Sequence, residues 1–342
     1  MAKLFHQQGD YEILAVDAGK LTLDPEGANQ LVKTAGTTCY QSADSTQKSP
    51  GEFVKMLKTR KHFAMTEFGG WPVAKIEVPP VWQKEVAGGI LLSSRFLYIT
   101  ERKEGSLLVS GNPRAWNEAY AVRKDPHVKT ILRFLSRANP VLYDYPAGSD
   151  GVNPNRVMLC PALETPEEIL THRAMIVRFN NCSRGFTHED VRHRVYSFGQ
   201  ESTRYVKYDG GMLFILPYRE YDEGLEIPVK VKGGEVLLNT QEIVDLYESV
   251  YRGYRNAGYQ PQEARQWLPI GIKSQIVQMS NLAGWRHWFF LRCARTAHPE
   301  IRHVACRLLE DVQGRVPGIF DDFEIYPHSE DGSLCAKSSH HS

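Results

Sequence analysis

The stretch from Thr187 to Tyr205 reads THEDVRHRVYSFGQESTRY, and it is far denser in hydrogen-bonding groups than folding alone requires. Three arginines lie within it, together with carboxylates, an amide and several hydroxyls. Guanidinium groups suit the oxygens of a phosphate, and the other groups can bind a sugar and a planar base. This stretch therefore predicts a nucleotide-binding loop.

The residues on either side of this stretch predict how the chain presents it. Apolar residues alternate from 173 to 180, which predicts a strand that leads directly into the stretch. Thr187 and Asp190 have the spacing of a capping box, so we expect a helix that begins at Thr187 and ends before Gly199. A solvated helix end with surface ion pairs is the alternative explanation for so many charges. We favour a ligand site because residues 197–200 interrupt the helix where its polar ends would meet a ligand.

The rest of the chain mixes the hydrophobic patterns of strands and helices. Strands are expected over 11–16, 71–78, 94–100, 106–110 and 212–217, and helices over 28–36, 50–60, 240–254, 274–295 and 299–314, with helical pieces in 112–135. This mixture predicts an α+β fold with a central, mostly antiparallel or mixed sheet flanked by long helices. No repeat or low-complexity linker is visible, so we expect a single domain over residues 1–342 with an insertion at about 69–170, made of a hairpin and helices.

Composition narrows the class of protein. The 342 residues are 42% hydrophobic and 24% charged, which is ordinary for a globular protein with a substantial core. Lys plus Arg number 41 and Asp plus Glu number 40, for a formal net charge of +1. This balance weighs against a protein that coats a nucleic-acid polymer through bulk charge. No apolar run approaches membrane-spanning length and the first residues lack the apolar core of a signal peptide, so we expect a cytoplasmic protein that does not bind a membrane.

Several common kinds of site are not predicted. The six cysteines are scattered without close pairs, so neither a zinc ribbon nor a disulfide framework is expected, and most should be reduced and buried. A Gly-x-Gly-x-x-Gly motif after a strand and a Walker A loop are both missing, which argues against a Rossmann site for a flavin or a nicotinamide. His188 and His193 are five residues apart rather than four and would diverge on a helix, so no metal site is expected.

The central stretch resembles a known enzyme family. Arg-His-Arg at 192–194, followed by seven residues and Ser202, is the signature of the flavin-dependent thymidylate synthases, and the wider stretch is similar to their long bacterial and phage branch. Residues 62–67, HFAMTE, resemble the family's upstream element, and 262–269 and 281–292 resemble its C-terminal half. The resemblance implies the fold of a thymidylate synthase-complementing protein.

The resemblance also implies roles for individual residues. The nucleotide-binding positions it implies are Glu189, Arg192, Gln200, Glu201, Ser202, Thr203, Arg204, Arg265 and Arg292. The positions it implies for FAD are Ala64, Arg192, His193, Arg194, Gln200, Asn281 and His287, with His62 beside the stacked flavin and folate. Ala64 stands where relatives often have Ser or Thr, so only a backbone contact is expected there. Gln200 and Gly199 stand where some members have Glu and Asn, which leaves the sugar contacts open.

Helical spacing gives an independent view of the C-terminal segment. Asn281, Trp285, Trp288 and Arg292 step by four, three and four residues, so they should share one helix face. The two tryptophans are expected in the core, whereas Asn281 and Arg292 are hard to bury without a ligand or partner. Cys293 should point about 100° away from Arg292 and is expected to be structural. For Arg265, a charge at a helix C-terminus is an equally good explanation.

The resemblance implies methylation at C5 of a uracil nucleotide, most simply dUMP to dTMP. Methylenetetrahydrofolate would donate the carbon, NADPH would reduce the flavin, and reduced FAD would supply hydride. The central stretch contains no cysteine, and the family activates uracil by charge: the guanidinium of Arg292 beside the ring would favour its anionic form. The resemblance further implies a homotetramer with sites built from several subunits.

Two alternatives stay open on the sequence alone. Within the same class, the enzyme would methylate UMP in nucleoside-antibiotic biosynthesis or transfer a hydroxymethyl group, and acceptance of a 2′-hydroxyl near residues 200–202 would distinguish it. In a different class, a non-catalytic nucleotide- or RNA-binding protein would use residues 192–194 to grip phosphates. The net charge near zero weighs against the RNA-binding alternative.

Overall fold

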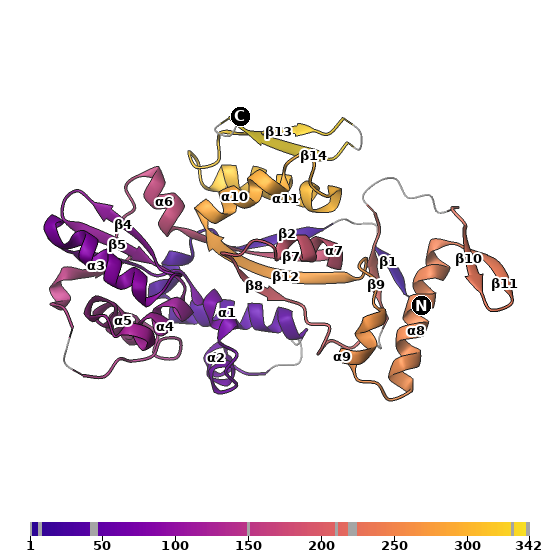
Figure 1. The fold of residues 1–342 in the computed structure, drawn as a ribbon, viewed down its shortest axis with the longest axis horizontal. Helices are drawn as coiled ribbons and strands as arrows, with labels where there is room; N and C mark the ends of the chain where they lie inside the picture. Colours follow the sequence, from indigo (N-terminus) through magenta and orange to yellow (C-terminus); the bar gives the residue numbers. More distant parts are fainter. Residues whose placement is uncertain are drawn as a thin grey trace.

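A four-stranded antiparallel sheet forms the centre of the molecule (Figure 1). The computed structural model describes residues 2–5, 9–41, 47–148, 151–208, 211–217, 224–329 and 332–339. The central strands are β2 (Asp10–Ala15), β7 (Ala174–Ser183), β12 (Lys273–Asn281) and β8 (Ser197–Gln200), in that spatial order. All neighbouring strands in this sheet run antiparallel. The structure thus confirms the predicted α+β class with an antiparallel central sheet.

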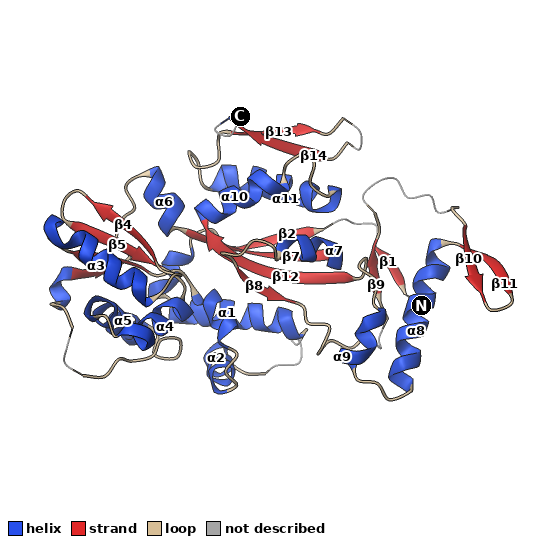
Figure 2. Cartoon of the chain, viewed as in Figure 1, coloured by secondary structure: helices blue, strands red, loops and turns tan. Residues whose placement is uncertain are grey.

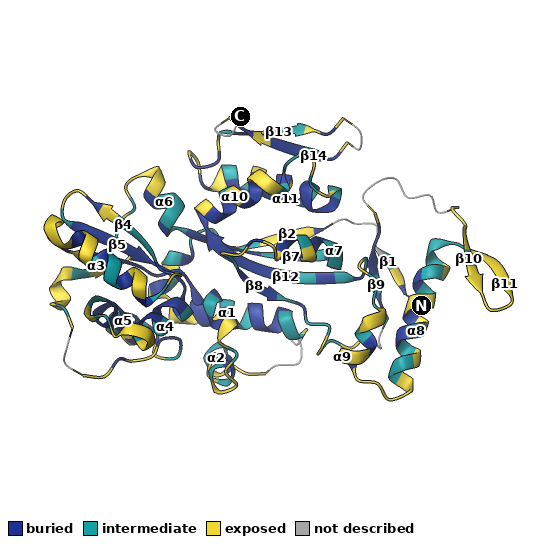
Figure 3. Ribbon diagram, in the orientation of Figure 1, coloured by how far each residue is buried: buried dark blue, intermediate teal, exposed yellow. Residues whose placement is uncertain are grey.

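Both faces of this sheet are covered by helices (Figure 2). Helices α1 (Pro25–Tyr40) and α2 (Pro50–Thr59) lie on one side, and α10 (Leu282–Arg292) and α11 (Pro299–Arg315) on the other. Side chains of a strand alternate between the two faces. In β7, Ile176 therefore joins the core on the α1 side, and Val177 joins the core on the α10 side. Double coverage explains why β7 and β12 are buried along most of their length, polar side chains included, as Figure 3 shows.

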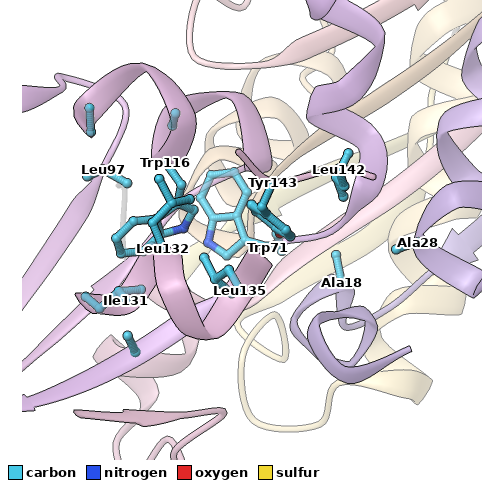
Figure 4. Close-up of a cluster of buried hydrophobic side chains, with 14 of the residues drawn as sticks. Ala18, Ala28, Trp71, Leu97, Trp116, Ile131, Leu132, Leu135, Leu142 and Tyr143 are labelled. Carbon is cyan, nitrogen blue, oxygen red and sulfur yellow. The ribbon is translucent and has the colours of Figure 1, made fainter. Parts of the chain in front are cut away.

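Residues 69–170 build a second antiparallel sheet beside the first. Its order is β4 (Tyr98–Arg102), β5 (Ser106–Ser110), β3 (Val73–Glu77) and β6 (Val157–Leu159). Helices α3 (Pro80–Ser93), α4 (Pro113–Arg123), α5 (Pro126–Ala138) and α6 (Pro166–His172) accompany it. Trp71, Trp116 and Leu132 fill its core, which continues to Ala18 and Ala28 near the central sheet (Figure 4). The region therefore holds a β4–β5 hairpin and helices, and shares one core with α1.

The remaining elements surround these two sheets. They are the 3₁₀ helices η1 (Ala18–Leu23), η2 (Phe63–Gly69), η3 (Pro154–Arg156) and η4 (Arg265–Trp267), the helices α8 (Thr240–Asn256) and α9 (Pro261–Ala264), and the strand pairs β1 (Lys3–Phe5) with β9 (Leu213–Ile215), β10 (Ile227–Val231) with β11 (Gly234–Leu238), and β13 (Phe323–Pro327) with β14 (Leu334–Ser338). Within the described ranges, no helix combines the length and the apolar character needed to cross a bilayer.

The predicted helix over 274–295 is wrong in its first half. Residues up to Asn281 form β12, and only from Leu282 does the chain become helical. Residues 274–281, SQIVQMSN, show no strict alternation of apolar and polar residues because the strand is buried on both faces, so pattern alone could not separate it from a helix. Asn281 marks the true boundary: its backbone is extended, and its side chain accepts a hydrogen bond from the Gly284 N–H at 2.9 Å.

The predicted helix start at Thr187 is also wrong. Helix α7 runs from Arg184 to Asp190, and the Oγ of Ser183 caps it by accepting from the Phe186 N–H at 3.0 Å. The hydroxyl of Thr187 instead donates to the carbonyl of Arg184. The Arg-His-Arg residues therefore follow the helix in a turn and are not carried on it.

Two smaller differences concern residues 80–102. Helix α3 occupies a segment for which no helix was predicted, and the first hairpin strand is Tyr98–Arg102 rather than 94–100. The cysteine expectation is confirmed, because all six are free and four of them are buried: Cys182, Cys293, Cys306 and Cys335.

Candidate functional site

Arg292 lies at the centre of a cluster at the C-terminal end of α7. Its Nε donates to Nε2 of His193 at 3.0 Å, its Nη2 donates to the backbone carbonyl of Glu189 at 2.7 Å, and its Nη1 pairs with the Glu189 carboxylate at 3.0 Å. Helix α10 ends at Arg292, so the guanidinium is presented from a helix terminus toward the turn that holds the signature. We call Glu189, His193 and Arg292 the Arg292 cluster.

His193 is held in its neutral form within this cluster. Burial, reinforced by the positive charges of Arg292 and His287, lowers its pKa to about 4. A guanidinium has only donors, so the imidazole Nε2 must accept from it. The cluster therefore carries its positive charge on Arg292, while His193 orients that group without adding charge.

Asp190 follows Glu189 in the chain, and the sequence predicted it only as part of a capping box and not as a site residue. It is fully buried, and its Oδ1 accepts from the indole N–H of Trp288 at 2.7 Å. The amide nitrogen of Gln278 donates to its Oδ2 and Oδ1 at 2.7 and 2.9 Å. Burial raises the pKa of Asp190 to about 7, although the Trp288 bond and the charge of Arg292 oppose the shift. Asp190 thus joins α7 to α10 through Trp288 and to β12 through Gln278.

A second cluster lies at the N-terminal end of α7, around Glu201. The Glu201 side chain is 3% exposed and accepts from Gln41 at 2.9 Å and from the hydroxyl of Tyr208 at 2.8 Å, while Arg184 donates to its backbone carbonyl at 2.9 Å. Lys273 lies 3.9 Å from the carboxylate. Burial raises the pKa of Glu201 against these favourable contacts. Partners within the chain therefore occupy both of its carboxylate oxygens.

Arg265 and Thr203 meet beside the Glu201 carbonyl. Arg265 follows α9 and donates from Nη1 to the Thr203 hydroxyl at 3.3 Å, so it is both a residue at a helix end and a neighbour of the signature. Burial lowers the pKa of Arg184, and the positive charge of Arg265 adds to the effect, while Tyr208 and Glu201 oppose it. Nearby, the Gln200 amide donates to Thr187, and the Arg204 backbone N–H donates to Oγ of Ser202 at 3.4 Å.

His62 is connected to the end of the signature by aromatic rings. The hydroxyl of Tyr40 is 2.7 Å from Nδ1 of His62, and the ring of Tyr40 meets that of Tyr205 at 5.4 Å. Arg204 lies over Tyr205 with 5.6 Å between its guanidinium carbon and the ring centroid. His62 precedes η2 without capping it through its side chain, and Ala64 in the first turn of η2 is exposed, so a backbone contact of Ala64 with a flavin stays a prediction.

Two exposed arginines give the site a donor set suited to a charged ligand. Arg192 and Arg194 flank the buried His193, and within the described chain neither guanidinium has a hydrogen bond or an ion pair. Free guanidinium forks beside a helix-terminal turn fit the pyrophosphate of a dinucleotide. His287 is exposed as well, with its ring 6.0 Å from that of His193. These residues therefore fit a flavin dinucleotide.

Asn281 is buried without needing a ligand. Its Nδ2 donates to the carbonyl of Thr171 at 3.0 Å, and its Oδ1 caps α10. The expectation that its burial requires a bound partner is therefore wrong, and a flavin contact at this position stays a prediction. Trp285 and Trp288 are fully buried, as predicted for core residues.

The structure divides the predicted nucleotide-binding residues between two places. Arg292 and Glu189 lie at one end of α7, while Arg265, Thr203 and Glu201 lie at the other. Seven helical residues separate these ends by roughly 10 Å. Sequence reasoning missed the residues that hold each group, namely Tyr40, Gln41, Arg184, Asp190 and Tyr208, since nothing in their local pattern distinguishes them.

Comparison with known proteins identifies the family. The family model described as thymidylate synthase complementing protein matches residues 163–318. A flavin-dependent thymidylate synthase of Corynebacterium diphtheriae is 34% identical over 174 residues, which are 50% of this chain and 69% of that protein. The chain belongs to the flavin-dependent thymidylate synthase family. A flavin-dependent thymidylate synthase of Pyrococcus furiosus is 33% identical over 150 residues, 44% of this chain and 58% of that protein.

Family membership confirms the class predicted from the signature, an enzyme of methyltransferase type. The segment of this chain that matches the family model begins at residue 163, after the last strand of the second sheet. It includes β7, α7, β8, β12 and α10. The crystal structure of a UMP/dUMP methylase, PolB from Streptomyces cacaoi bound with 5-Br UMP, is 14% identical, with a TM-score of 0.39 over 94% of this chain and 96% of that one.

Proposed function

We propose that this chain is a flavin-dependent C5 methylase of uracil nucleotides that converts dUMP to dTMP. The observation that carries the proposal is the Arg292 cluster, in which a permanently charged guanidinium is fixed by a neutral imidazole and a carboxylate. Such a preorganised cation favours the anionic form of a uracil ring placed beside it, and with it a nucleophilic C5.

The chain's own residues have separate tasks in this proposal. Arg292 stabilises negative charge on the ring, and Glu189 and His193 orient its guanidinium. Arg265, Thr203, Ser202 and Arg204 bind the phosphate and sugar of the nucleotide. Arg192 and Arg194 bind the anionic part of FAD, which when reduced supplies hydride. Methylenetetrahydrofolate donates the carbon, and NADPH regenerates the reduced flavin.

We further propose that the enzyme works as a homotetramer whose sites are shared between subunits. The exposed Arg192 and Arg194 are placed to reach a ligand held partly by a neighbour.

A tritium-release assay tests this function directly. Nucleotides labelled at C5 are offered with and without a 2′-hydroxyl, in the presence of FAD, methylenetetrahydrofolate and NADPH. Release from labelled dUMP is expected, together with a flavin absorbance band that is lost on reduction. Faster release from UMP would assign the enzyme to ribonucleotide methylation, and formation of hydroxymethyluracil would change the product. A colourless protein that takes up no FAD would support a non-catalytic binding module.

A further inference from the structure

One residue of the 69–170 region reaches the element that carries His62 and Ala64. Arg114, in the first turn of α4, donates from Nη1 to Oε1 of Glu67 at 3.0 Å. Its Nε donates to Glu118, one helical turn further on, at 2.6 Å. The start of α4 is itself anchored, because Asn112 caps it by accepting from the Ala115 N–H at 2.8 Å. Arg114 therefore projects from a fixed helix end.

Glu67 connects this arginine to the signature stretch. Its second oxygen accepts from the hydroxyl of Ser197 at 2.6 Å, and Ser197 is the first residue of β8. The Glu67 side chain is 17% exposed, so most of its contacts lie within the protein. A 3₁₀ helix has three residues per turn, which places Ala64 and Glu67 on the same side of η2. One carboxylate thus bridges η2 and the strand that follows the Arg-His-Arg turn.

We propose that Arg114 is a positioning residue: it holds Glu67, and through it the Ala64 side of η2, against β8, so that the 69–170 region takes part in forming the FAD site. The inference rests on the proposed function, because FAD is the ligand that would lie along η2 and the Arg-His-Arg turn. An exposed arginine with a single surface ion pair would contribute little. Arg114 differs because its partner is a mostly buried carboxylate whose other oxygen is bonded to the signature.

The charges around Glu67 specify how removal of Arg114 would act. Burial raises the pKa of Glu67, the Ser197 hydrogen bond and Arg114 lower it, and Glu118 raises it slightly. These groups, from α4 and β8, are the ones that face the carboxyl. Without Arg114, Glu67 takes up a proton at a higher pH. Protonation removes the negative charge that strengthens the hydrogen bond from Ser197, so the bridge between η2 and β8 weakens first on the acid side.

The test uses the whole chain, freed of flavin, and measures the dissociation constant for FAD by fluorescence across a range of pH. Arg114→Gln is expected to weaken FAD binding about tenfold, as for a lost hydrogen bond to a charged group. It should also shift the acid limb, the part of the pH profile in which FAD affinity falls as the pH is lowered, to higher pH. Arg114→Lys keeps the charge and should restore the acid limb. The matched control is Arg123→Gln, which removes an exposed charge from the same helix without touching Glu67.

A double-mutant cycle decides whether Arg114 acts through Glu67. If it does, Arg114→Gln has no further effect on FAD affinity in a Glu67→Gln background. Additive losses, or an Arg114→Gln variant that matches Arg123→Gln in affinity and acid limb, would overturn the positioning role. Failure of the proposed function looks different, because then the unmodified chain itself binds no FAD and releases no tritium.

Discussion

The guanidinium of Arg292 and the imidazole of His193 are joined by a 3.0 Å hydrogen bond in which the imidazole accepts. The bond connects the end of α10 to the turn after α7, two segments 99 residues apart in the chain. Because the imidazole is neutral, the carboxylate of Glu189 is the ion-pair partner of Arg292 among the described residues. Glu189 therefore has two effects on a bound ligand: it offsets part of the positive charge of Arg292, and together with His193 it fixes where that charge lies.

Replacing Arg292 tests its assigned role directly. Arg292→Ala should keep FAD binding but lose methyl transfer, and Arg292→Lys should reduce turnover by about a hundredfold, because an ammonium cannot reproduce the three bonds to His193 and Glu189. Tritium release measures turnover, and the flavin absorbance band measures cofactor uptake. Unchanged turnover in either variant would contradict the role of Arg292.

Two buried histidines should make the protein less stable in acid. Burial is the main cause that lowers the pKa of His193 and of His172 from 6.5 to about 4. The unfolded chain binds protons to them first, so the free energy of unfolding falls as the pH drops from about 6.5 to about 4, by up to about 1.4 kcal/mol per pH unit for each. His193→Gln should lose less stability than the unmodified chain in this window. Urea unfolding at several pH values measures the free energy of unfolding of each variant. His188→Gln, at an exposed position, should lose as much stability in acid as the unmodified chain does.

Asp190 should have the opposite dependence on pH. Its pKa is raised from 3.8 to about 7, so the folded protein must ionise it in a buried site as the pH rises through this range. Asp190→Asn keeps an acceptor for Trp288, and the Gln278 amide can turn to accept from the new NH₂ group. We expect the stability of the variant relative to the unmodified chain to increase from about pH 4 to pH 7. The exposed Asp144→Asn control should show no such trend, and a flat difference for Asp190→Asn would disprove the burial argument.

The sequence predicted those parts of the fold whose patterns are local. Alternation in β7, the periodicity of α8 and the start of α11 at Pro299 each depend on residues within one element. Residues 273–281 were misread because their strand character comes from pairing with β7 and β8, far away in the chain. Likewise, Ser183 caps α7 while it is held by Glu300, a contact across 117 residues.

The candidate site likewise combines residues that a local motif predicts with residues that depend on contacts far apart in the chain. A spaced motif predicted the Arg-His-Arg residues and Ser202 as site residues, and the resemblance of residues 281–292 to the family added Arg292. It did not identify Asp190 or Arg114, whose importance lies in contacts with Trp288 and Glu67 across 98 and 47 residues. Nor did it show that partners within the chain satisfy Asn281 and Glu201.

Ser183 connects helix stability to the Arg292 cluster. Its Oγ caps α7 and donates to Glu300, and its N–H donates to the same carboxylate at 2.7 Å. Ser183→Ala removes the cap and leaves a buried carboxylate, 4% exposed, with one donor fewer, so we expect a loss of about 2 kcal/mol in unfolding free energy. Because α7 carries Glu189, which orients Arg292, the affinity for dUMP should fall as well.

Ser49→Ala is the matched control, because Ser49 caps α2 through a capping box away from the signature. It should cost about 1 kcal/mol of stability and leave dUMP affinity unchanged. Isothermal titration with dUMP and urea unfolding on both variants separate the two effects. If both variants lost the same stability and neither lost affinity, the cap of α7 would have no part in orienting Arg292.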